Sequence, residues 1–519
     1  MTKRLTAVLA TWVLVCGAGG AYGQERAPAK AFYVDPDWQG ERSGSAGSPW
    51  TRVDPRAWRE IDRALAGSDV VVYFSARDAD ADRNQLSKQS ITILRTDPST
   101  HRVTLDGMSK YNADDASPKW LDNRGGTRHE IHHHYPVGAF RGQKRNYVTI
   151  RGFKTVAGYG RGGQGVVYWG GDHVVIEHCE VTKSKDVKHG PGIIFGYAWN
   201  ADGTAKNGGC VDLVIRNNVV HHTFGEGIYI GGSQDVNRPA HRDVLIEGNV
   251  VYDVAAYGGE GDAIDIKDGS SNVIVRGNTL YMTKPGAGRD GIAMSSGGII
   301  EGNFIYNFGR DGITLGTYWN AFACRKGTVV RNNIIVNTGG NPNYSWDYGI
   351  KVGGGAGIKP DHGSEDQYDD LAVYNNTVVG VRGDRKREGV GLDISRFATG
   401  AKVTNNLIVN SAFLNFLAGP DCLAEHDYNL FHSTTGGLVA RYGSQTFTAE
   451  TLKRFEPHSL SVDPKFVNPS VPYAPEGFRL HPTSPAVGAG VKIDTFDTDF
   501  FGTKRGGRWD IGAIQTKNP

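Results

Sequence analysis

The stretch Val273-Ile-Val-Arg-Gly-Asn278 decides the fold, because close copies of it recur along most of the chain. Other copies are Val174-Val-Ile-Glu-His-Cys179, Leu213-Val-Ile-Arg-Asn-Asn218, Val244-Leu-Ile-Glu-Gly-Asn249, Ile299-Ile-Glu-Gly-Asn303, Val329-Val-Arg-Asn-Asn333, Leu371-Ala-Val-Tyr-Asn-Asn376 and Val403-Thr-Asn-Asn406. Between Asn218 and Asn406, successive asparagines are separated by 31, 29, 25, 30, 43 and 30 residues. A period of about 20–50 residues with strand-like phrases and no helical pattern indicates a β-solenoid or a β-propeller.

A second phrase in each period distinguishes these two folds. It has a small residue followed by apolar, variable and apolar positions: Gly165-Val-Val-Tyr168, Gly192-Ile-Ile-Phe195, Gly227-Ile-Tyr-Ile230, Ala263-Ile-Asp-Ile266, Gly291-Ile-Ala-Met294, Gly312-Ile-Thr-Leu315, Gly349-Ile-Lys-Val352 and Gly391-Leu-Asp-Ile394. A propeller blade needs four strands in about 40–50 residues, and the shortest period, 25 residues, has no room for them. We therefore expect an all-β, right-handed parallel β-helix with inward apolar columns and a stacked ladder of asparagines in its turns.

The composition agrees with a long folded rod. The 519 residues exceed the size of one compact domain, and the 71 glycines are about twice the usual share. With 39% hydrophobic and 22% charged residues, the chain is not expected to be disordered. Its net charge of +2 offers no basic field for nucleic acid, so we expect no nucleic-acid partner.

The N-terminal residues predict secretion. Lys3 and Arg4 precede an apolar run that is too short for a membrane span, and Ala21 and Gly23 are small residues suited to a signal-peptidase site. We expect residues 1–23 to be a cleaved signal peptide and the protein to be secreted, extracellular or periplasmic, without a membrane span. In such a compartment, the four remaining cysteines (Cys179, Cys210, Cys324 and Cys422) permit zero, one or two disulfides.

The ends of a solenoid expose apolar cross-sections and need covers. Residues 54–66 predict a cap helix, with Asp54 as N-cap, Pro55 at the first helical position and Trp58, Ile61 and Leu65 on one face. We divide the mature chain into an N-terminal strand and cap helix (24–75), the β-helix (76–435) and a C-terminal capping segment that wraps or closes the last coil (436–519).

One coil concentrates charged residues at outward positions. Glu260, Asp262, Asp265, Lys267 and Asp268 lie within nine residues. When the second phrases are aligned, Glu226 lies one coil below this group, and Asp290 and Asp311 lie in the coils above it. Unpaired like charges about 5 Å apart raise one another's pKa and need a cation, a proton or a basic partner. Calcium, which takes six to eight oxygen ligands, fits that need, with Glu226, Glu260, Asp262, Asp265 and Asp290 as metal ligands. The alternative for Asp290 and Asp311 is ordinary turn chemistry.

Two resemblances bear on function. Phe32-Tyr-Val-Asp-Pro36, Gly44 to Trp50, the coils, Ser484-Pro-Ala-Val-Gly-Ala-Gly490 and Trp509-Asp-Ile-Gly-Ala513 resemble secreted bacterial β-helix proteins of the pectate-lyase-like superfamily. That superfamily includes lyases, hydrolases, epimerases and adhesins. The stretch from Glu260 to Lys267 is similar to polysaccharide lyase family six, the chondroitinase B and alginate lyase group. There a Glu-x-Glu pair binds calcium and a lysine seven residues after the first Glu abstracts the proton. The family's arginine in the next coil aligns with Ser295 here.

This resemblance implies β-elimination at a uronic acid, with an acidic polysaccharide as the partner of a monomeric enzyme. Calcium would neutralise the substrate carboxylate, and Lys267 would be the base, its pKa depressed by calcium and by Arg289. Arg289 at the coil start replaces the missing arginine. Tyr229, or His221 and His222, would protonate the leaving oxygen, and Arg310, Arg325 and Lys351 would hold acidic subsites. The alternative interpretation of His221 and His222 is that they are turn residues that follow a strand.

Two other functional classes remain open. A glycoside hydrolase of the same fold would use paired carboxylates from Asp262, Asp265 and Asp290. A carbohydrate-binding surface protein without catalysis would give no product. The stretch His129-Glu-Ile-His-His133 matches the zinc-protease pattern, but that chemistry needs a helix, which Gly125, Gly126 and Pro136 disfavour.

Overall fold

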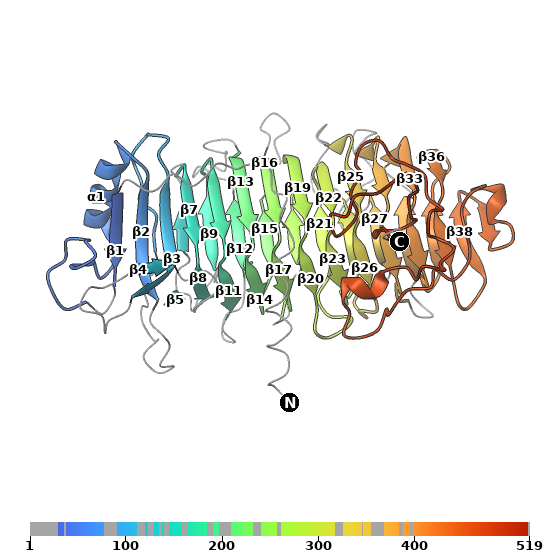
Figure 1. Cartoon of the computed structure of the whole chain (residues 1–519), viewed down its shortest axis with the longest axis horizontal. Helices are drawn as coiled ribbons and strands as arrows, with labels where there is room; N and C mark the ends of the chain where they lie inside the picture. The colour runs from blue at the N-terminus through green and yellow to red at the C-terminus, as the bar shows by residue number, and fades with distance from the viewer. Residues whose placement is uncertain are drawn as a thin grey trace.

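The fold was analysed in a computed structural model. The structure describes residues 30–35, 38–76, 91–111, 120–122, 129–133, 137–139, 145–157, 165–183, 190–196, 209–231, 240–256, 261–316, 325–344, 346–353, 368–383, 388–394 and 398–516. The predicted signal peptide, Glu260 and Cys324 lie outside these residues. The chain forms a rod in which the strands lie side by side across the long axis (Figure 1).

Three long sheets, almost wholly parallel, run the length of the rod, as the right-handed parallel β-helix prediction requires, and each regular coil gives one strand to each sheet. The first sheet contains β1 (Lys30–Val34), β2 (Val70–Ala76), β3 (Val103–Tyr111), β7 (Val148–Arg151), β10 (Val174–Glu177), β13 (Val211–Arg216), β16 (Arg242–Glu247), β19 (Ser271–Arg276), β22 (Gly298–Glu301), β25 (Val329–Arg331), β29 (Ala372–Tyr374), β33 (Ala401–Thr404) and β36 (Leu423–Asp427), with β4 (Trp120–Asp122) antiparallel to β3.

The second and third sheets follow in each coil. The second contains β5 (His129–His133), β8 (Phe153–Ala157), β11 (Glu180–Lys183), β14 (Val219–His221), β17 (Val250–Tyr252), β20 (Thr279–Tyr281), β23 (Phe304–Tyr306), β26 (Ile334–Val336), β30 (Thr377–Val379), β34 (Leu407–Val409) and β37 (Leu430–His432). The third contains β6 (Val137–Ala139), β9 (Val166–Trp169), β12 (Ile193–Gly196), β15 (Ile228–Ile230), β18 (Ile264–Ile266), β21 (Ile292–Met294), β24 (Asp311–Leu315), β27 (Trp346–Val352), β31 (Glu388–Ile394), β35 (Leu414–Ala418), β38 (Leu438–Tyr442) and β39 (Gln445–Thr448). A short pair is formed by β28 (Tyr368–Asp369) and β32 (Ala398–Thr399).

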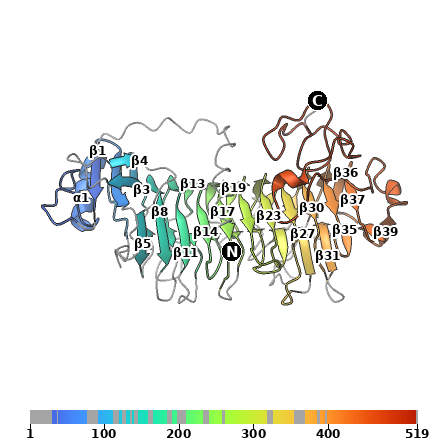
Figure 2. The same cartoon turned by 60° about the horizontal axis from the view of Figure 1, so that its bottom comes forward.

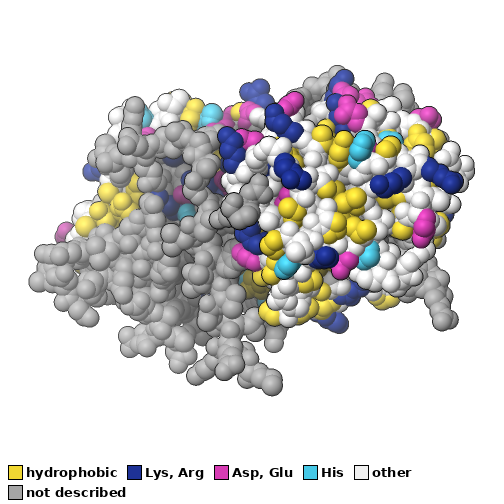
Figure 3. Space-filling view, turned by 45° about the vertical axis from the view of Figure 1, so that its right-hand side comes forward, with side chains coloured by type: hydrophobic (Ala, Val, Ile, Leu, Met, Phe, Trp, Pro, Cys, Tyr) yellow, Lys and Arg dark blue, Asp and Glu magenta, His cyan; other side chains and the backbone are white. Residues whose placement is uncertain are grey.

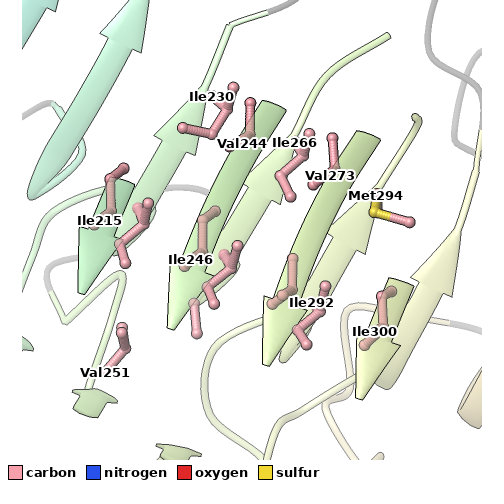
Figure 4. Packing of buried hydrophobic residues seen from close by; sticks show 14 of the residues in the cluster. Ile215, Ile230, Val244, Ile246, Val251, Ile266, Val273, Ile292, Met294 and Ile300 are labelled. Atoms are coloured by element: carbon pink, nitrogen blue, oxygen red, sulfur yellow. The ribbon is translucent and has the colours of Figure 1, made fainter. Parts of the chain in front are cut away.

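The core is the set of inward columns that the repeated phrases predict. Val244 and Ile246 of β16, Val251 of β17 and Ile264 and Ile266 of β18 are buried, and equivalent residues of the next coils stack on them (Figure 4). Burial of each such aliphatic side chain stabilises the fold by about 1.5–3 kcal/mol. The dry core fixes the register, so every other residue of a strand faces outward at a set position.

The predicted asparagine ladder is confirmed. Asn249 Nδ2 donates to Asn278 Oδ1 at 3.0 Å, and Asn278 Nδ2 donates to Asn303 Oδ1 at 2.9 Å. The same side chains accept the backbone N–H of the asparagine one coil below and donate to a strand carbonyl. Each buried amide therefore satisfies backbone groups at the turn between the first and second sheets.

The first sheet carries alternating charges on its outer face. Arg216 pairs with Glu177 at 2.6 Å and Arg276 pairs with Glu247 at 2.7 Å, and the same pattern continues in Arg331 and Glu301. Opposite signs on neighbouring strands favour this register. On the described part of the face in Figure 3, acidic, basic and hydrophobic side chains are interspersed.

The N-terminal end is covered as predicted. Helix α1 (Pro55–Leu65) begins after Asp54, whose carboxylate accepts the backbone N–H groups of Arg56 and Ala57, and it buries Trp58, Ile61 and Leu65. Strands β1 and β2 continue the first sheet, so regular pairing begins before residue 76. Among the helices that the structure describes, none is long and apolar enough to cross a membrane.

The C-terminal segment does two things. The antiparallel strand β39 and the residues after it close the end of the core, with Phe447 and Leu452 buried. The remainder turns back along the second sheet (Figure 2) and covers its outward apolar residues: Phe478, Ala513 and Ile514 pack on Phe304, Ile334 and Val336. The segment therefore closes the last coil, as one of the two predicted alternatives states, and it also covers one side of the rod.

The described cysteines form no disulfide. Cys179, Cys210 and Cys422 are buried, and no disulfide joins any two of them. The core columns and the asparagine ladder, rather than cross-links among these three thiols, stabilise this part of the rod.

Candidate functional site

The outward positions of the third sheet are aligned as the sequence predicted. Tyr229 pairs with Asp265, Asp265 with Ala293, and Ala293 with Thr314, and Lys351 follows in the next coil. Asp265 lies between the buried residues Ile264 and Ile266, so its side chain points away from the core. The backbone N–H of Ser295 bonds to the carbonyl of Ile266, which places Ser295 beside Lys267 in the next coil.

Three aspartates form a buried ladder just before these strands. Asp262 Oδ1 accepts the backbone N–H of Asp290 at 3.1 Å, and Asp290 Oδ1 accepts the backbone N–H of Asp311 at 3.3 Å. Asp311 in turn accepts the backbone N–H of Tyr348 and the hydroxyl of Thr314. The turn role that the sequence left open for Asp290 and Asp311 is therefore present, because these carboxylates join successive coils.

Each carboxylate of this region has a cationic partner. Lys267 Nζ lies 2.7 Å from Asp265 Oδ2, and Arg289 Nε lies 3.8 Å from Asp262 Oδ1. Arg310 binds both oxygens of Asp290, with Nε 2.7 Å from Oδ1, and lies 3.2 Å from Asp311. The aspartate side chains are at most 4% exposed, whereas Lys267, Arg289 and Arg310 are 13%, 17% and 14% exposed. We call these three residues the cationic row: they form the partly exposed layer, and the acids lie beneath them.

Burial and mutual repulsion shift Asp262, Asp265 and Asp311 toward the protonated form. Burial, followed by the charges of Asp290 and Asp265, raises the pKa of Asp262 well above its usual range. Burial also raises the pKa of Asp311 to about 6, although Arg310 opposes the shift. The pKa of Asp265 is raised by burial and only partly lowered again by Lys267.

The pKa of Lys267 is shifted in the direction opposite to the one predicted from the sequence. Burial alone would lower its pKa, but the charge of Asp265 and the hydrogen bond to it outweigh burial and raise the pKa above its ordinary value. The depressed pKa expected from the sequence is therefore wrong for the free protein. The sequence placed an arginine and a metal near the amine, but the nearest described charge is the aspartate two residues earlier.

Aromatic rings flank the cationic row. Lys267 Nζ lies 5.7 Å from the ring centroid of Tyr229, which places this predicted catalytic residue beside the amine. Arg310 lies 5.5 Å from the ring centroid of Tyr344, a residue that the sequence analysis missed because it belongs to a loop outside the repeated phrases. Lys351 Nζ lies 4.7 Å from the ring of Tyr348 in the same strand, and its charge acts on Asp311.

Several predicted residues lie elsewhere. His221 and His222 are at the end of β14 in the second sheet, where His221 stacks on Tyr252, and Tyr252 stacks on Tyr281. Their assignment to the leaving-group side of the Lys267 site is not supported by any described contact, because the two rings stand on a different sheet. Arg325 is 1% exposed and paired with Asp268, so this pair is structural and offers no subsite.

The described acids do not fit a calcium site as they stand. Asp262 is paired with Arg289, Asp265 with Lys267 and Asp290 with Arg310. The described residues contain no group of three or more His, Cys, Asp or Glu side chains placed to hold a metal. Glu226 is half-buried, and Glu260 lies outside the described residues. A calcium ion, which needs about six oxygen ligands, would have to displace the cationic partners, so no chemical step below is routed through it.

Comparison with known proteins places the fold in a family. The curated proteins give no match. Similar solved structures include pectate lyase Pel9A (14% identity over 94% of this chain and 97% of that chain, TM-score 0.41), an alginate lyase from Paenibacillus sp. str. FPU-7 (17%, 66% and 93%, 0.34) and the A-module of the Azotobacter vinelandii mannuronan C-5 epimerase AlgE4 (13%, 83% and 100%, 0.42). A family model described as "Right handed beta helix region" matches residues 127–281 and 203–408, which together span more than half of the chain. The chain therefore belongs to the right-handed β-helix family.

Proposed function

We propose that this protein is a secreted polysaccharide lyase that cleaves a uronic-acid polymer by β-elimination on the outer face of its third sheet. The observation that carries the proposal is the cationic row: Lys267, Arg289 and Arg310 are partly exposed, and they pair with acids that are more deeply buried. Cationic side chains at the surface suit a polymer that carries a carboxylate on each sugar.

Arg289 and Arg310 supply the charge that neutralises the substrate carboxylate. Arg310 is held rigidly, since both Asp290 oxygens and Asp311 engage it. Neutralisation acidifies the C5 proton and stabilises the carbanion that develops at C5. Preorganised cations do this with little reorganisation, because the buried aspartates already fix their positions.

Lys267 is the base in this proposal, and Asp265 makes that role possible. In the free protein the amine is charged. When a bound sugar excludes water, the charged pair loses its solvation and becomes less stable than the neutral pair. The proton then moves from Lys267 to Asp265, because burial already raises the pKa of Asp265. The neutral amine then takes the C5 proton.

Tyr229 completes the elimination. The electron pair of the C5–H bond forms the C4–C5 double bond, the C4–O bond breaks, and the phenol gives its proton to the leaving oxygen. Lys267, now protonated and 5.7 Å from the ring centroid of Tyr229, returns a proton to the phenolate through the sugar hydroxyls. Asp265 then returns its proton to Lys267, which restores the ion pair, and the products are a hydroxyl end and an unsaturated uronate.

A glycoside hydrolase is the second candidate, favoured by the raised pKa of Asp262, because a general acid needs a carboxyl that holds its proton. Its burial argues against it, because Asp262 and Asp265 are 3% and 2% exposed beneath the cations. A hydrolase would need two carboxyl groups that reach the glycosidic oxygen and its water.

The test is incubation of the purified full chain with alginate, pectate, dermatan sulfate and a neutral polysaccharide. We expect an unsaturated product from one of the acidic polymers, followed by its ultraviolet absorbance and by mass spectrometry. Lys267→Ala should abolish the product, whereas Lys326→Ala, which removes an exposed lysine paired with Asp370, should not. Saturated products from any polymer would support the hydrolase, and binding without product would support a binding protein.

A further inference from the structure

We propose that His221 and His222 form a binding site for a divalent transition metal in tetragonal geometry, copper(II) or nickel(II), on the outer face of the second sheet. The two Nδ1 atoms face each other at 2.8 Å. This site is on a different sheet from the cationic row and does not depend on the proposed lyase activity.

The backbone turns both rings to the same side. Neighbouring residues of a strand normally point to opposite faces, but β14 ends at His221, and His222 adopts a left-handed φ of 50°. That conformation is uncommon for a residue with a side chain. It brings His222 beside His221, with the rings at 86° and their centroids 5.0 Å apart.

Aromatic stacking fixes the ring positions. His221 stacks on Tyr252 at 4.8 Å with an interplanar angle of 5°, and His222 meets the edge of the same ring at 5.8 Å. Tyr252 is held in turn by Tyr281, which stacks on it at 5.0 Å. The two nitrogen donors are therefore preorganised by a ladder of rings that continues to Tyr306.

The other nitrogen of each ring faces a carboxylate. His221 Nε2 is 3.6 Å from Glu180, and His222 Nε2 is 3.8 Å from Asp253. Asp253 is itself fixed by the backbone N–H and the hydroxyl of Thr283, and Glu180 by Lys154. These contacts are longer than hydrogen bonds, but a carboxylate on the side of the remote nitrogen is the usual outer shell of a metal-binding histidine and favours a proton on Nε2.

Two Nδ1 atoms at 2.8 Å either share a proton in a hydrogen bond or bind one metal ion between them. With metal–nitrogen bonds of about 2.0–2.1 Å, a nitrogen separation of 2.8 Å corresponds to an angle at the metal of slightly less than 90°. That angle suits neighbouring positions of a square-planar or octahedral ion and is too small for tetrahedral zinc. Nitrogen and oxygen ligands in tetragonal geometry are typical of copper(II) and nickel(II). The side chains are 16% and 45% exposed, so solvent reaches the pair and water can complete the coordination.

The experiment is a titration of the full chain, prepared without a histidine tag, with copper chloride and with nickel chloride, followed by calorimetry. Wild type should bind one equivalent with a Kd at least about tenfold lower than His222→Gln, since outer-shell changes alone often cost about 10–100-fold. The matched control is His458→Gln. His458 also stacks on a tyrosine, at 4.7 Å from Tyr428, and also meets a carboxylate, but its Nδ1 is taken by Asp427.

The copper complex of the wild type gives a second readout that needs no variant. Its electron paramagnetic resonance spectrum should show coupling to two equivalent nitrogens. A spectrum with one nitrogen, or equal stoichiometry and Kd for wild type and His222→Gln, would overturn the proposal and leave a shared proton between the rings. Unchanged copper binding by Lys267→Ala would separate this site from the proposed catalytic one.

Discussion

Lys267 and Asp265 lie two residues apart at the end of β18, and their Nζ and Oδ2 atoms are 2.7 Å apart. The pair forms because alternate residues of a strand share a face. Its aspartate is 2% exposed and its lysine 13%, so the carboxylate is the buried anchor and the amine the group that meets solvent. A proton that moves along this contact converts a charged pair into an acid and a free amine.

We expect Asp265→Asn to reduce turnover at neutral pH by about 10²–10⁴-fold and to leave part of it recoverable at alkaline pH. Without Asp265, the largest opposition to the burial that lowers the pKa of Lys267 is lost, but the amine must release its proton to solvent before it can act. The neutral fraction of an amine grows as pH rises through its pKa, so the rate should rise in the same direction. Initial rates measured across pH test this.

The control for this experiment is Asp370→Asn, which breaks the exposed pair with Lys326 and should leave the pH profile unchanged. An Asp265→Asn profile that superimposes on that of the wild type would rule out proton transfer between the two side chains.

We expect Arg310→Ala to lower the free energy of unfolding by about 3–5 kcal/mol, because it strands the buried Asp290 carboxylate without its bidentate partner. Urea unfolding of the variant and the wild type measures the loss. Arg276→Ala, which removes a more exposed partner of Glu247, should cost less than about 1 kcal/mol.

Asn278 offers a test of the ladder itself. Its side chain accepts the backbone and side-chain N–H groups of Asn249 and donates to Ile246 and Asn303. We expect Asn278→Ala to destabilise the protein by about 3 kcal/mol or more, since each buried group left without a partner costs about 1–3 kcal/mol. Asn272→Ala, which breaks one exposed bond to Asp243, is the control. Equal unfolding midpoints for the two variants would show that the ladder contributes little.

The fold and the cationic row differ in how far the sequence predicts them. The positions of Asn249 and Ile246 recur in each coil at similar spacing. Packing and hydrogen bonding in one coil therefore repeat in the next, and the sequence pattern predicts them. The alternation of Glu247 and Arg276 was equally visible, although only the register of the first sheet shows that they pair. Lys267 and Asp265 could be placed on one outward face for the same reason.

The partners of the acids could not be predicted in this way. Arg289 and Arg310 come from the coil turns, and Tyr344 from a loop whose path the repeat does not set. Whether the pKa of Lys267 is raised or lowered depends on which charged group lies nearest to its amine. The spacing of residues in the sequence does not give those distances. His221 and His222 were predicted either to protonate the leaving oxygen or to be turn residues. The structure places them at the end of a strand of the second sheet, and the order of residues along the coil does not give that distance from Lys267.

Removal of calcium distinguishes two predictions: the structure predicts a lyase that does not need calcium, and the resemblance to polysaccharide lyase family six predicts one that does. Because Asp265, Asp262 and Asp290 are paired with Lys267, Arg289 and Arg310, respectively, and are not left to bind a metal ion, we expect lyase activity to fall less than about twofold after chelation and dialysis. The measurement is the initial rate with chelator, with calcium restored, and with magnesium in its place. Loss of activity that calcium alone restores would support the site predicted from Glu226, Glu260, Asp262, Asp265 and Asp290, and would mean that the ion displaces the three cations. Lys267→Ala would remain inactive in either case, since the base is required whether a metal ion or the arginines hold the substrate.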